Sequence, residues 1–199
     1  MQDQEPQVAG LVLAAGRSSR FGAPKQLALL AGRPLLDHVL ALGIEAGLRP
    51  LVAVVPPWLS PTAVRPRPAS LRWVANPHPE LGVRHSLALG LAALGEAPGP
   101  LPEAVVILLA DQPTLSPDAI RRVISGRGPR PVVAAFAEGR LGHPVLIERS
   151  HWRLVEQIRD EGGLGPMLTH RPDLVTAVEF PGHPLDVDRP EDLGALEDA

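Results

Sequence analysis

Cationic and small residues stand close together near the start of the chain, in the segment LVLAAGRSSRFGAPKQL at positions 11–27. The apolar run Val8–Leu13 is short and bounded, which is typical of a buried strand. Open α/β sheets bind ligands in the loops at the carboxyl ends of such strands. Small residues let the backbone approach an anion, and cations supply charge, so this loop predicts a nucleoside triphosphate site. Its candidate phosphate-binding residues are Ala14, Ala15, Gly16, Arg17, Arg20 and Lys25.

The spacing of this loop differs from two common phosphate-binding motifs. Gly16 and Gly22 do not have the Walker spacing, and Lys25 is followed by Gln26 instead of Ser or Thr. The dinucleotide-binding fingerprint needs a third glycine in register. By spacing alone, a surface turn with solvated arginines is an equal alternative.

A carboxylate follows the most apolar run of the chain. Residues 104–109 are almost wholly apolar, as expected of a central parallel strand, and Asp111 comes directly after them. Asp111 should therefore reach the same sheet edge as Gly16. Mg²⁺ binds one or two carboxylates together with phosphate oxygens, so Asp111 is a candidate metal ligand. The alternative is that Asp111 only begins a turn.

Two further carboxylates lie near the end of the chain, in the string DVDRPEDL at positions 186–193. In an extended segment Asp186 and Asp188 would point to the same side. Together with Asp111 they would complete a site for a hard cation. The simpler alternative is that Asp188 caps the last helix.

Two other groups of residues are weaker candidates. Gly82 opens a predicted helix whose N-terminus can receive polar or anionic groups, and Ser86 lies one turn further on. From spacing alone, Ser86 is more often an ordinary helix residue. His143 stands in the loop Gly142-His143-Pro144, where a lone histidine is more often structural or solvated than catalytic.

Strand-like and helix-like segments alternate along the chain, with neither internal repeats nor a linker. This alternation predicts one α/β domain over residues 1–199, with a doubly wound, mostly parallel sheet and helices on both faces. Strands are expected at residues 8–13, 51–55, 71–75, 104–109, 131–137, 144–147, 174–178 and 185–187. Helices are expected at residues 34–46, 82–94 and 190–196, from Ser116 onward, and from Ser150 to Asp160.

Composition excludes several classes of protein. The net charge is −3 and the arginines are dispersed, which argues against a nucleic-acid partner. There are no cysteines, so the chain has neither disulfides nor a thiolate metal site. No apolar run reaches the ~20 residues that a membrane span needs. Residues 1–10 contain acidic residues and no basic one, unlike a signal peptide. We therefore expect a soluble, cytoplasmic protein.

Residues 13–25 resemble, without a gap, the signature loop of nucleotidyltransferases related to molybdenum cofactor biosynthesis, LAAGxSxR(F/M)GxxK. The string Asp111-Gln112-Pro113 resembles the magnesium-binding motif of that family. Residues 186–193 resemble its closing motif DxDTPEDL, with Arg189 in place of Thr. Each string is weak alone, but together they are specific, and they occur in family order.

The resemblance implies a reaction and a set of roles. An acceptor phosphate attacks the α-phosphorus of CTP, CMP is transferred to molybdopterin, and pyrophosphate leaves. Asp111 and Asp188, and less directly Asp186, would hold Mg²⁺; Lys25 would neutralise the α-phosphate and Arg17 the pyrophosphate. His143 would lie near the acceptor. The implied nucleotide-binding residues are Leu13, Ala14, Ala15, Gly16, Arg17, Lys25, Asn76, Gly82 and Ser86.

CTP is the first choice because guanylyl-transferring relatives usually have Gly where this chain has Ala15. Relatives often show a GDxGAR motif before a late helix, where this chain has Glu161 and Gly165 in place of Asp and Arg. The acceptor is therefore the least defined part. The alternatives are GTP or another nucleotide, a sugar-phosphate acceptor, or a non-catalytic nucleotide-binding chaperone for a partner molybdoenzyme.

Overall fold

A mixed sheet forms the centre of the computed structural model, which describes residues 7–65, 68–136, 139–158, 164, 174–182 and 185–197. Within these residues the sheet has seven strands in the order β5-β4-β1-β6-β8-β7-β9. The strands are β1 (Val8–Leu13), β4 (Leu51–Val55), β5 (Leu71–Ala75), β6 (Ala104–Leu109), β7 (Val132–Ala135), β8 (Leu141–Glu148) and β9 (Thr176–Glu179). All neighbouring pairs are parallel except the two that involve β8.

Helices cover both faces of this sheet. The α-helices are α1 (Leu35–Glu45), α2 (Gly82–Gly95), α3 (Pro117–Ser125) and α5 (Pro190–Glu197). Val12 of β1 is fully buried in a core shared with Leu36 of α1 and Ile120 of α3. Its neighbour Leu11 is equally buried in a second core, with Leu87 of α2. Successive residues of a strand point to opposite faces, so the two cores confirm the predicted doubly wound, mostly parallel α/β fold.

Local signals explain where two of the helices begin or end. The Ser116 hydroxyl accepts a hydrogen bond from Ala119 N at 3.1 Å, so it caps α3 as its position predicted. Gly47 follows α1 with φ of +85°, a left-handed conformation that glycine adopts without strain. Both boundaries were predicted from residue type alone.

Beyond shifts in the bounds of β7, β8 and β9, the structure differs from the sequence prediction in three elements. The predicted helix from Ser150 is a 3₁₀ helix, η5 (Arg149–Gln157); only Val155 of it is buried, so little apolar contact supports an α-helix. Residues 185–187 do not form a strand, because the segment bonds to the end of β6 through Val187 N and Asp111 O, at 2.9 Å, and not through a ladder. A short ribbon of β2 (Leu29–Leu30) and β3 (Arg33–Pro34) was not predicted.

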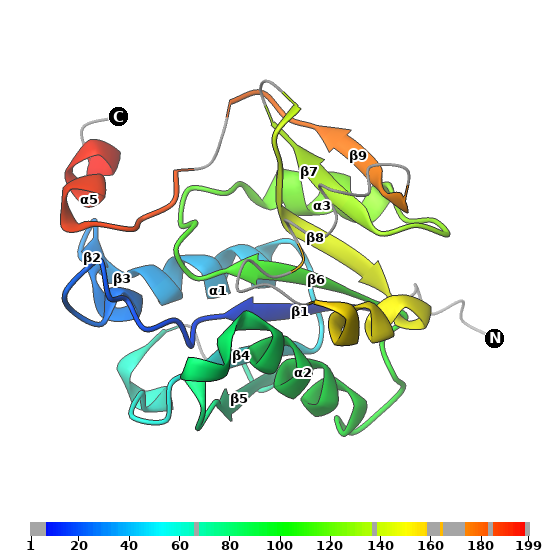
Figure 1. The fold of residues 1–199 in the computed structure, drawn as a ribbon, viewed down its shortest axis with the longest axis horizontal. Helices are drawn as coiled ribbons and strands as arrows, with labels where there is room; N and C mark the ends of the chain where they lie inside the picture. The colour runs from blue at the N-terminus through cyan, green and yellow to red at the C-terminus, as the bar shows by residue number, and fades with distance from the viewer. Residues whose placement is uncertain are drawn as a thin grey trace.

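This ribbon and α5 form a small third core beside the signature loop. Leu30, Leu35 and Val187 are buried together, and Leu193 and Leu196 of α5 pack against them. The carboxyl ends of β1 and β6 point toward the same edge of the molecule, where α5 and the ribbon lie (Figure 1). The third core therefore holds the end of the chain against the edge at which a ligand site is expected. Of the helices in the described residues, none has the length and apolar character of a membrane span.

Candidate active site

The signature loop after β1 is fastened to its own starting corner. Gln26 lies in the short 3₁₀ helix η1 (Lys25–Leu27) and is 2% exposed. Its amide nitrogen donates to the backbone oxygens of Ala14 at 2.6 Å and Gly16 at 2.9 Å. These bonds bring Lys25 back toward the end of β1. The sequence showed Gln26 only as a departure from the Walker motif, so this role was missed.

The loop also has a constrained backbone. Ser18 has φ of +53°, a left-handed conformation that costs free energy for a residue other than glycine. Its hydroxyl accepts a hydrogen bond from Lys25 N at 3.3 Å, which ties the strained residue to the far end of the loop. Strain of this kind is often found in loops that bind ligands.

Lys25 lies between two carboxylates from distant parts of the chain. Its Nζ atom is 2.7 Å from Asp111 Oδ2 and 3.2 Å from Asp188 Oδ1, and it donates to Val187 O at 3.1 Å. The Lys25 side chain is only 16% exposed. Burial lowers the pKa of Lys25, whereas the negative charges and hydrogen bonds of Asp111 and Asp188 raise it. Together the two carboxylates outweigh burial, so the pKa of Lys25 lies above its ordinary value. The ammonium is therefore charged at neutral pH.

Asp188 is held at this site from both sides. Its second oxygen, Oδ2, is 3.2 Å from Arg20 Nη1. The Asp192 carboxylate accepts hydrogen bonds from Asp188 N at 2.8 Å and Arg189 N at 2.7 Å, and these bonds lower the pKa of Asp192. Asp192 thus satisfies the backbone at the start of α5, and the Asp188 side chain contacts cations instead. The pairing of Arg20 with Asp188 was not predicted.

The three carboxylates predicted to bind metal do not form one cluster. Gln112 Nε2 donates to Asp186 Oδ1 at 2.7 Å, whereas Asp111 and Asp188 share Lys25. Among the residues that the structure describes, no three His, Cys, Asp or Glu side chains lie close enough to hold a metal ion. Asp186 positions Gln112, and its role as a metal ligand stays a prediction.

Asp111 and Asp188 nevertheless fit a divalent cation. Asp111 Oδ1 is buried and has no hydrogen-bond partner among the residues that the structure describes, which leaves a hard oxygen ligand available. Carboxylate oxygens are the ligands that Mg²⁺ takes from proteins, with phosphates and water completing its shell. Asp111 and Asp188 would therefore supply one or two ligands to such a cation, and the phosphates of a substrate would supply others.

Of the cavities that border the signature loop, two reach Asp111. One, of about 300 Å³, holds the charged residues; the other, of about 270 Å³, lies against the start of α2. Leu13, Gly16 and Asp111 line both. Of the other predicted residues, the first cavity is lined by Ala14, Arg17, Lys25 and Asp188 and the second by Ala15, Gly82 and Ser86. Most of the predicted nucleotide site is thus brought together.

Asn76 is bonded to Ser86, which lines the second cavity. It is fully buried, its amide nitrogen donates to Ser86 Oγ at 3.0 Å, and its amide oxygen accepts from His78 N at 2.8 Å. Gly82, with φ of +80°, follows the 3₁₀ helix η3 (Pro79–Leu81) and begins α2, whose N-terminus has no side-chain cap. Asn76 therefore orients Ser86 and the turn before α2.

His143 lies on β8 and interacts electrostatically with Asp111. Burial of the imidazole lowers the pKa of His143 to about 4, and Asp111 only partly opposes this shift. The ring is therefore neutral at pH 7. Its predicted contact with the acceptor stays a prediction.

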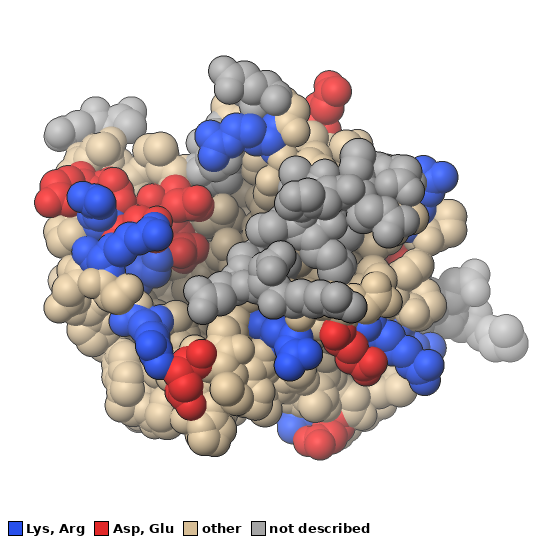
Figure 2. Space-filling model, in the orientation of Figure 1, with Lys and Arg blue, Asp and Glu red and all other residues tan. Residues whose placement is uncertain are grey.

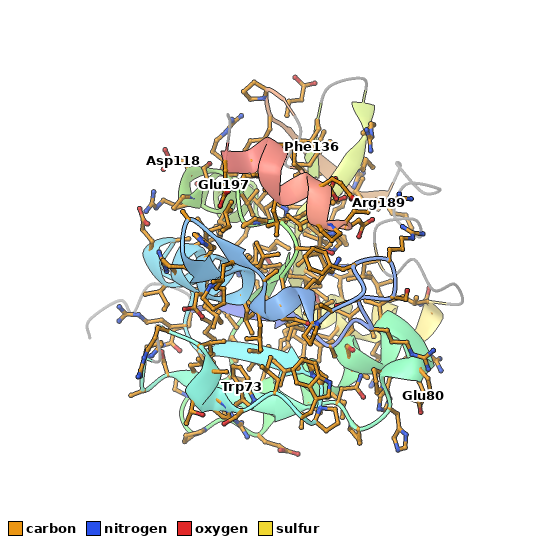
Figure 3. The ribbon with its side chains drawn as sticks, turned by 90° about the vertical axis from the view of Figure 1, so that its left-hand side faces the viewer. Trp73, Glu80, Asp118, Phe136, Arg189 and Glu197 are labelled. Carbon is orange, nitrogen blue, oxygen red and sulfur yellow. The ribbon has the colours of Figure 1, made fainter. Side chains whose placement is uncertain are left out.

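The edge that carries these residues is charged and open. Figure 2 shows acidic and basic side chains interleaved on the side of the molecule where α5 lies. Figure 3 looks onto that side, with Arg189 near the start of α5 above the signature loop and Glu80 of η3 below it. The loop thus lies between α5 and the start of α2.

The sequence matches the MobA-like NTP transferase domain over residues 10–175. The chain belongs to this family. Asp188 and α5 lie beyond the matched range, so the place of Asp188 in the site rests on the geometry described above. Gly165 and residues 159–163 lie outside the described residues, and with them the proposed counterpart of the GDxGAR motif.

The chain is similar over part of its length to a GlmU protein and to a molybdenum cofactor guanylyltransferase. The bifunctional protein GlmU of Halorhodospira halophila is 32% identical over 123 residues, which cover 61% of this chain and 25% of GlmU. Molybdenum cofactor guanylyltransferase of Xanthomonas euvesicatoria pv. vesicatoria is 34% identical over 116 residues, covering 58% of this chain and 53% of that protein. The chain therefore spans only part of the length of both relatives.

Solved structures resemble nearly the whole length of the chain. The crystal structure of Rv0371c from Mycobacterium tuberculosis H37Rv superimposes with a TM-score of 0.82 at 28% identity, covering 98% of this chain and 100% of that one. A structure of Rv0371c in complex with manganese superimposes with a TM-score of 0.77. This likeness confirms the fold at nearly full length.

Proposed function

We propose that residues 1–199 form one nucleotidyltransferase domain, which transfers a nucleotidyl group from a nucleoside triphosphate to a phosphorylated acceptor and releases pyrophosphate. The observation that carries this proposal is Lys25, placed between Asp111 and Asp188 in a cavity lined by Gly16. A cation and carboxylates beside a glycine-containing loop suit a phosphate chain and its metal ion.

The acceptor needs no protein base. A phosphate monoester carries about −1.5 to −2 charges at pH 7 and is already a nucleophile. The task of the protein is therefore to align the acceptor with the α-phosphorus and to neutralise charge. A neutral His143 suits a place near the acceptor, because it can donate a hydrogen bond without attracting the metal-binding carboxylates.

Each cationic residue has a place in this scheme. Lys25 is nearest the carboxylates and would contact the α-phosphate, while Arg17 and Arg20, on the loop, would contact the departing pyrophosphate. Asp111 and Asp188 would hold a divalent cation, proposed to be Mg²⁺, which when bound supplies further charge neutralisation. The manganese complex of Rv0371c supports a divalent ion in this fold.

The proposed donor is CTP and the proposed acceptor is molybdopterin. Ala15 lines the cavity at α2 with Gly82 and Ser86, and its methyl group narrows the space for a base. The relative named as a molybdenum cofactor guanylyltransferase supports the acceptor, and it makes GTP the second candidate donor. A molybdoenzyme would then be the partner that receives the product.

Pyrophosphate release tests this function directly. The wild-type chain is incubated with Mg²⁺, molybdopterin and each of the four nucleoside triphosphates in turn. Asp111→Asn and Asp188→Asn should each remain folded and lose about 10²–10³-fold in turnover, as when one well-placed electrostatic contact is removed. Asp118→Asn is the matched control, because the Asp118 side chain is 82% exposed on α3. Unchanged turnover in Asp111→Asn, or no pyrophosphate with any nucleotide, would contradict the proposal.

A further inference from the structure

Lys25 uses its full hydrogen-bonding capacity within the site. An ammonium has three N–H donors, and Nζ contacts three acceptors: Asp111 Oδ2, Asp188 Oδ1 and Val187 O. The backbone oxygen is fixed, because Val187 is fully buried in the third core. The ammonium is therefore a built-in cation that joins the two carboxylates.

A metal ion and this ammonium compete for the same oxygens. Mg²⁺ binds oxygen at 2.0–2.1 Å and dehydrates reluctantly, so it needs unobstructed ligands. The oxygens through which Asp111 and Asp188 converge are the two that Lys25 contacts, at 2.7 and 3.2 Å. Asp111 Oδ1, although unpartnered, offers a single ligand. A dication bridging both carboxylates must therefore displace Lys25.

Charge makes this displacement unfavourable for a metal ion alone. Three cationic side chains, Arg17, Arg20 and Lys25, and two carboxylates, Asp111 and Asp188, line the cavity. The cavity thus has an excess of positive charge, and a bare dication adds to it. A triphosphate brings more negative charge than the dication brings positive, and it also offers Lys25 a new anionic partner within reach of a flexible stem.

We propose that the Lys25 ammonium keeps a divalent cation without nucleotide from binding to Asp111 and Asp188. When a nucleotide phosphate binds the ammonium, Lys25 leaves the two carboxylates and the cation can bind to them; we call this arrangement the Lys25 gate. The metal then enters the site together with the nucleotide, and the enzyme does not hold a resident ion. This proposal rests on the proposed function and deepens it, since it assigns the order in which the two ligands occupy one site.

Binding of Mn²⁺ alone to the full chain tests the gate, because free Mn²⁺ gives an electron paramagnetic resonance signal that bound Mn²⁺ loses. Lys25→Met should bind Mn²⁺ at least about tenfold more tightly than wild type without nucleotide, since the competing cation is gone. Lys25→Arg keeps the charge and should stay as weak as wild type. In the double variant Lys25→Met, Asp111→Asn the gain should disappear. Circular dichroism confirms that each variant is folded.

A second arm adds a CTP analogue with a methylene bridge between the α- and β-phosphates, which binds without reacting. After subtraction of the Mn²⁺ that the analogue binds in protein-free solution, wild type should bind Mn²⁺ at least tenfold more tightly than without the analogue. Equal Mn²⁺ affinity of wild type and Lys25→Met, or tight Mn²⁺ binding by wild type alone, would overturn the gate. Mn²⁺ binding is measured separately from pyrophosphate release. If pyrophosphate is released but the Mn²⁺ affinities contradict the gate, the gate is wrong and the proposed function still holds.

Discussion

Gly16 shows how one missing methyl group can define a ligand site. It lines both cavities, and a Cβ atom built on it meets no atom of the described residues within 4 Å. Packing within the protein therefore does not require glycine at this position. Under the proposed function, a phosphate chain bound at this loop would require it, because only glycine leaves the backbone N–H uncovered at close range.

Gly16→Ala should therefore fold normally and bind nucleotide poorly. The added methyl group enters the cavity, and we expect nucleotide affinity to fall by about 10–200-fold, the range for one methylene in a binding pocket. Nucleotide titration and a thermal melt measure the two effects separately. Gly128→Ala is the control, because its Cβ also meets no atom within 4 Å but lies outside both cavities. Normal nucleotide affinity in Gly16→Ala would place the phosphates elsewhere.

Ala15 should set the choice of nucleotide. Cytosine has one ring and guanine two, so the methyl group of Ala15, which narrows the second cavity, should favour CTP. Pocket shape alone discriminates by about 1–3 kcal/mol, so we expect a preference and not exclusion. Ala15→Gly should relax it only partly. The measurement is kcat/KM for CTP and GTP in both proteins, and a preference of the wild type for GTP would reverse the assignment.

The charged residues of the candidate site were more predictable from the sequence than the residues that hold them in place. Lys25, Asp111 and Asp188 stand out because their charges follow predicted strands or a recognisable loop. Only the structure shows that Gln26 bonds to the corner at Ala14 and Gly16. Likewise, only the structure pairs Arg20 with Asp188, which is 168 residues away. A polar side chain in a loop has many possible partners, and only the fold selects one.

At the scale of elements, α2 lies unusually close to β1 at Gly90. A Cβ atom on Gly90 would lie 2.3 Å from the Leu11 side chain, which is fully buried. Gly90→Ala should therefore force α2 away from the sheet and destabilise the protein by about 1–3 kcal/mol, the usual cost of overpacking. Urea unfolding measures this, and Gly95→Ala, at the open end of the same helix, should change little. Equal stability of the two variants would mean that Leu11 repacks freely.

This close approach also matters for the site, since α2 carries Gly82 and Ser86 and β1 leads into Gly16. Gly90→Ala should raise the KM for nucleotide as well, because both sides of the second cavity move apart.

The bounds of β1, β4, β5 and β6 matched the prediction, since each is a short apolar run. Strand β8 begins earlier than predicted because Leu141 and Gly142 pair with β7, and η5 is not an α-helix because only one of its residues is buried.

At the scale of the whole molecule, the site depends on the complete fold. The signature loop, Asp111 and Asp188 come from the first, middle and last parts of the chain, and the third core joins the last part to the first. Pairing between segments 86 and 163 residues apart cannot be inferred from local patterns. The signature loop was expected near Asp111 because both follow strands that end at one sheet edge, whereas Asp188 was expected there from the resemblance to the family's closing motif.

The free energy of unfolding should depend on pH through His143. Its pKa is about 4 in the folded protein and near 6.5 in the unfolded chain, so between these values the unfolded chain binds a proton that the folded protein does not. Protons therefore favour unfolding, and stability should fall as pH decreases from about 6.5 to 4. His143→Gln cannot bind this proton and should lose less stability over that range. Urea unfolding at pH 7 and pH 4.5 measures the difference, with His78→Gln, whose side chain is 59% exposed, as the control. Parallel losses in wild type and His143→Gln would show that His143 titrates as a solvated residue.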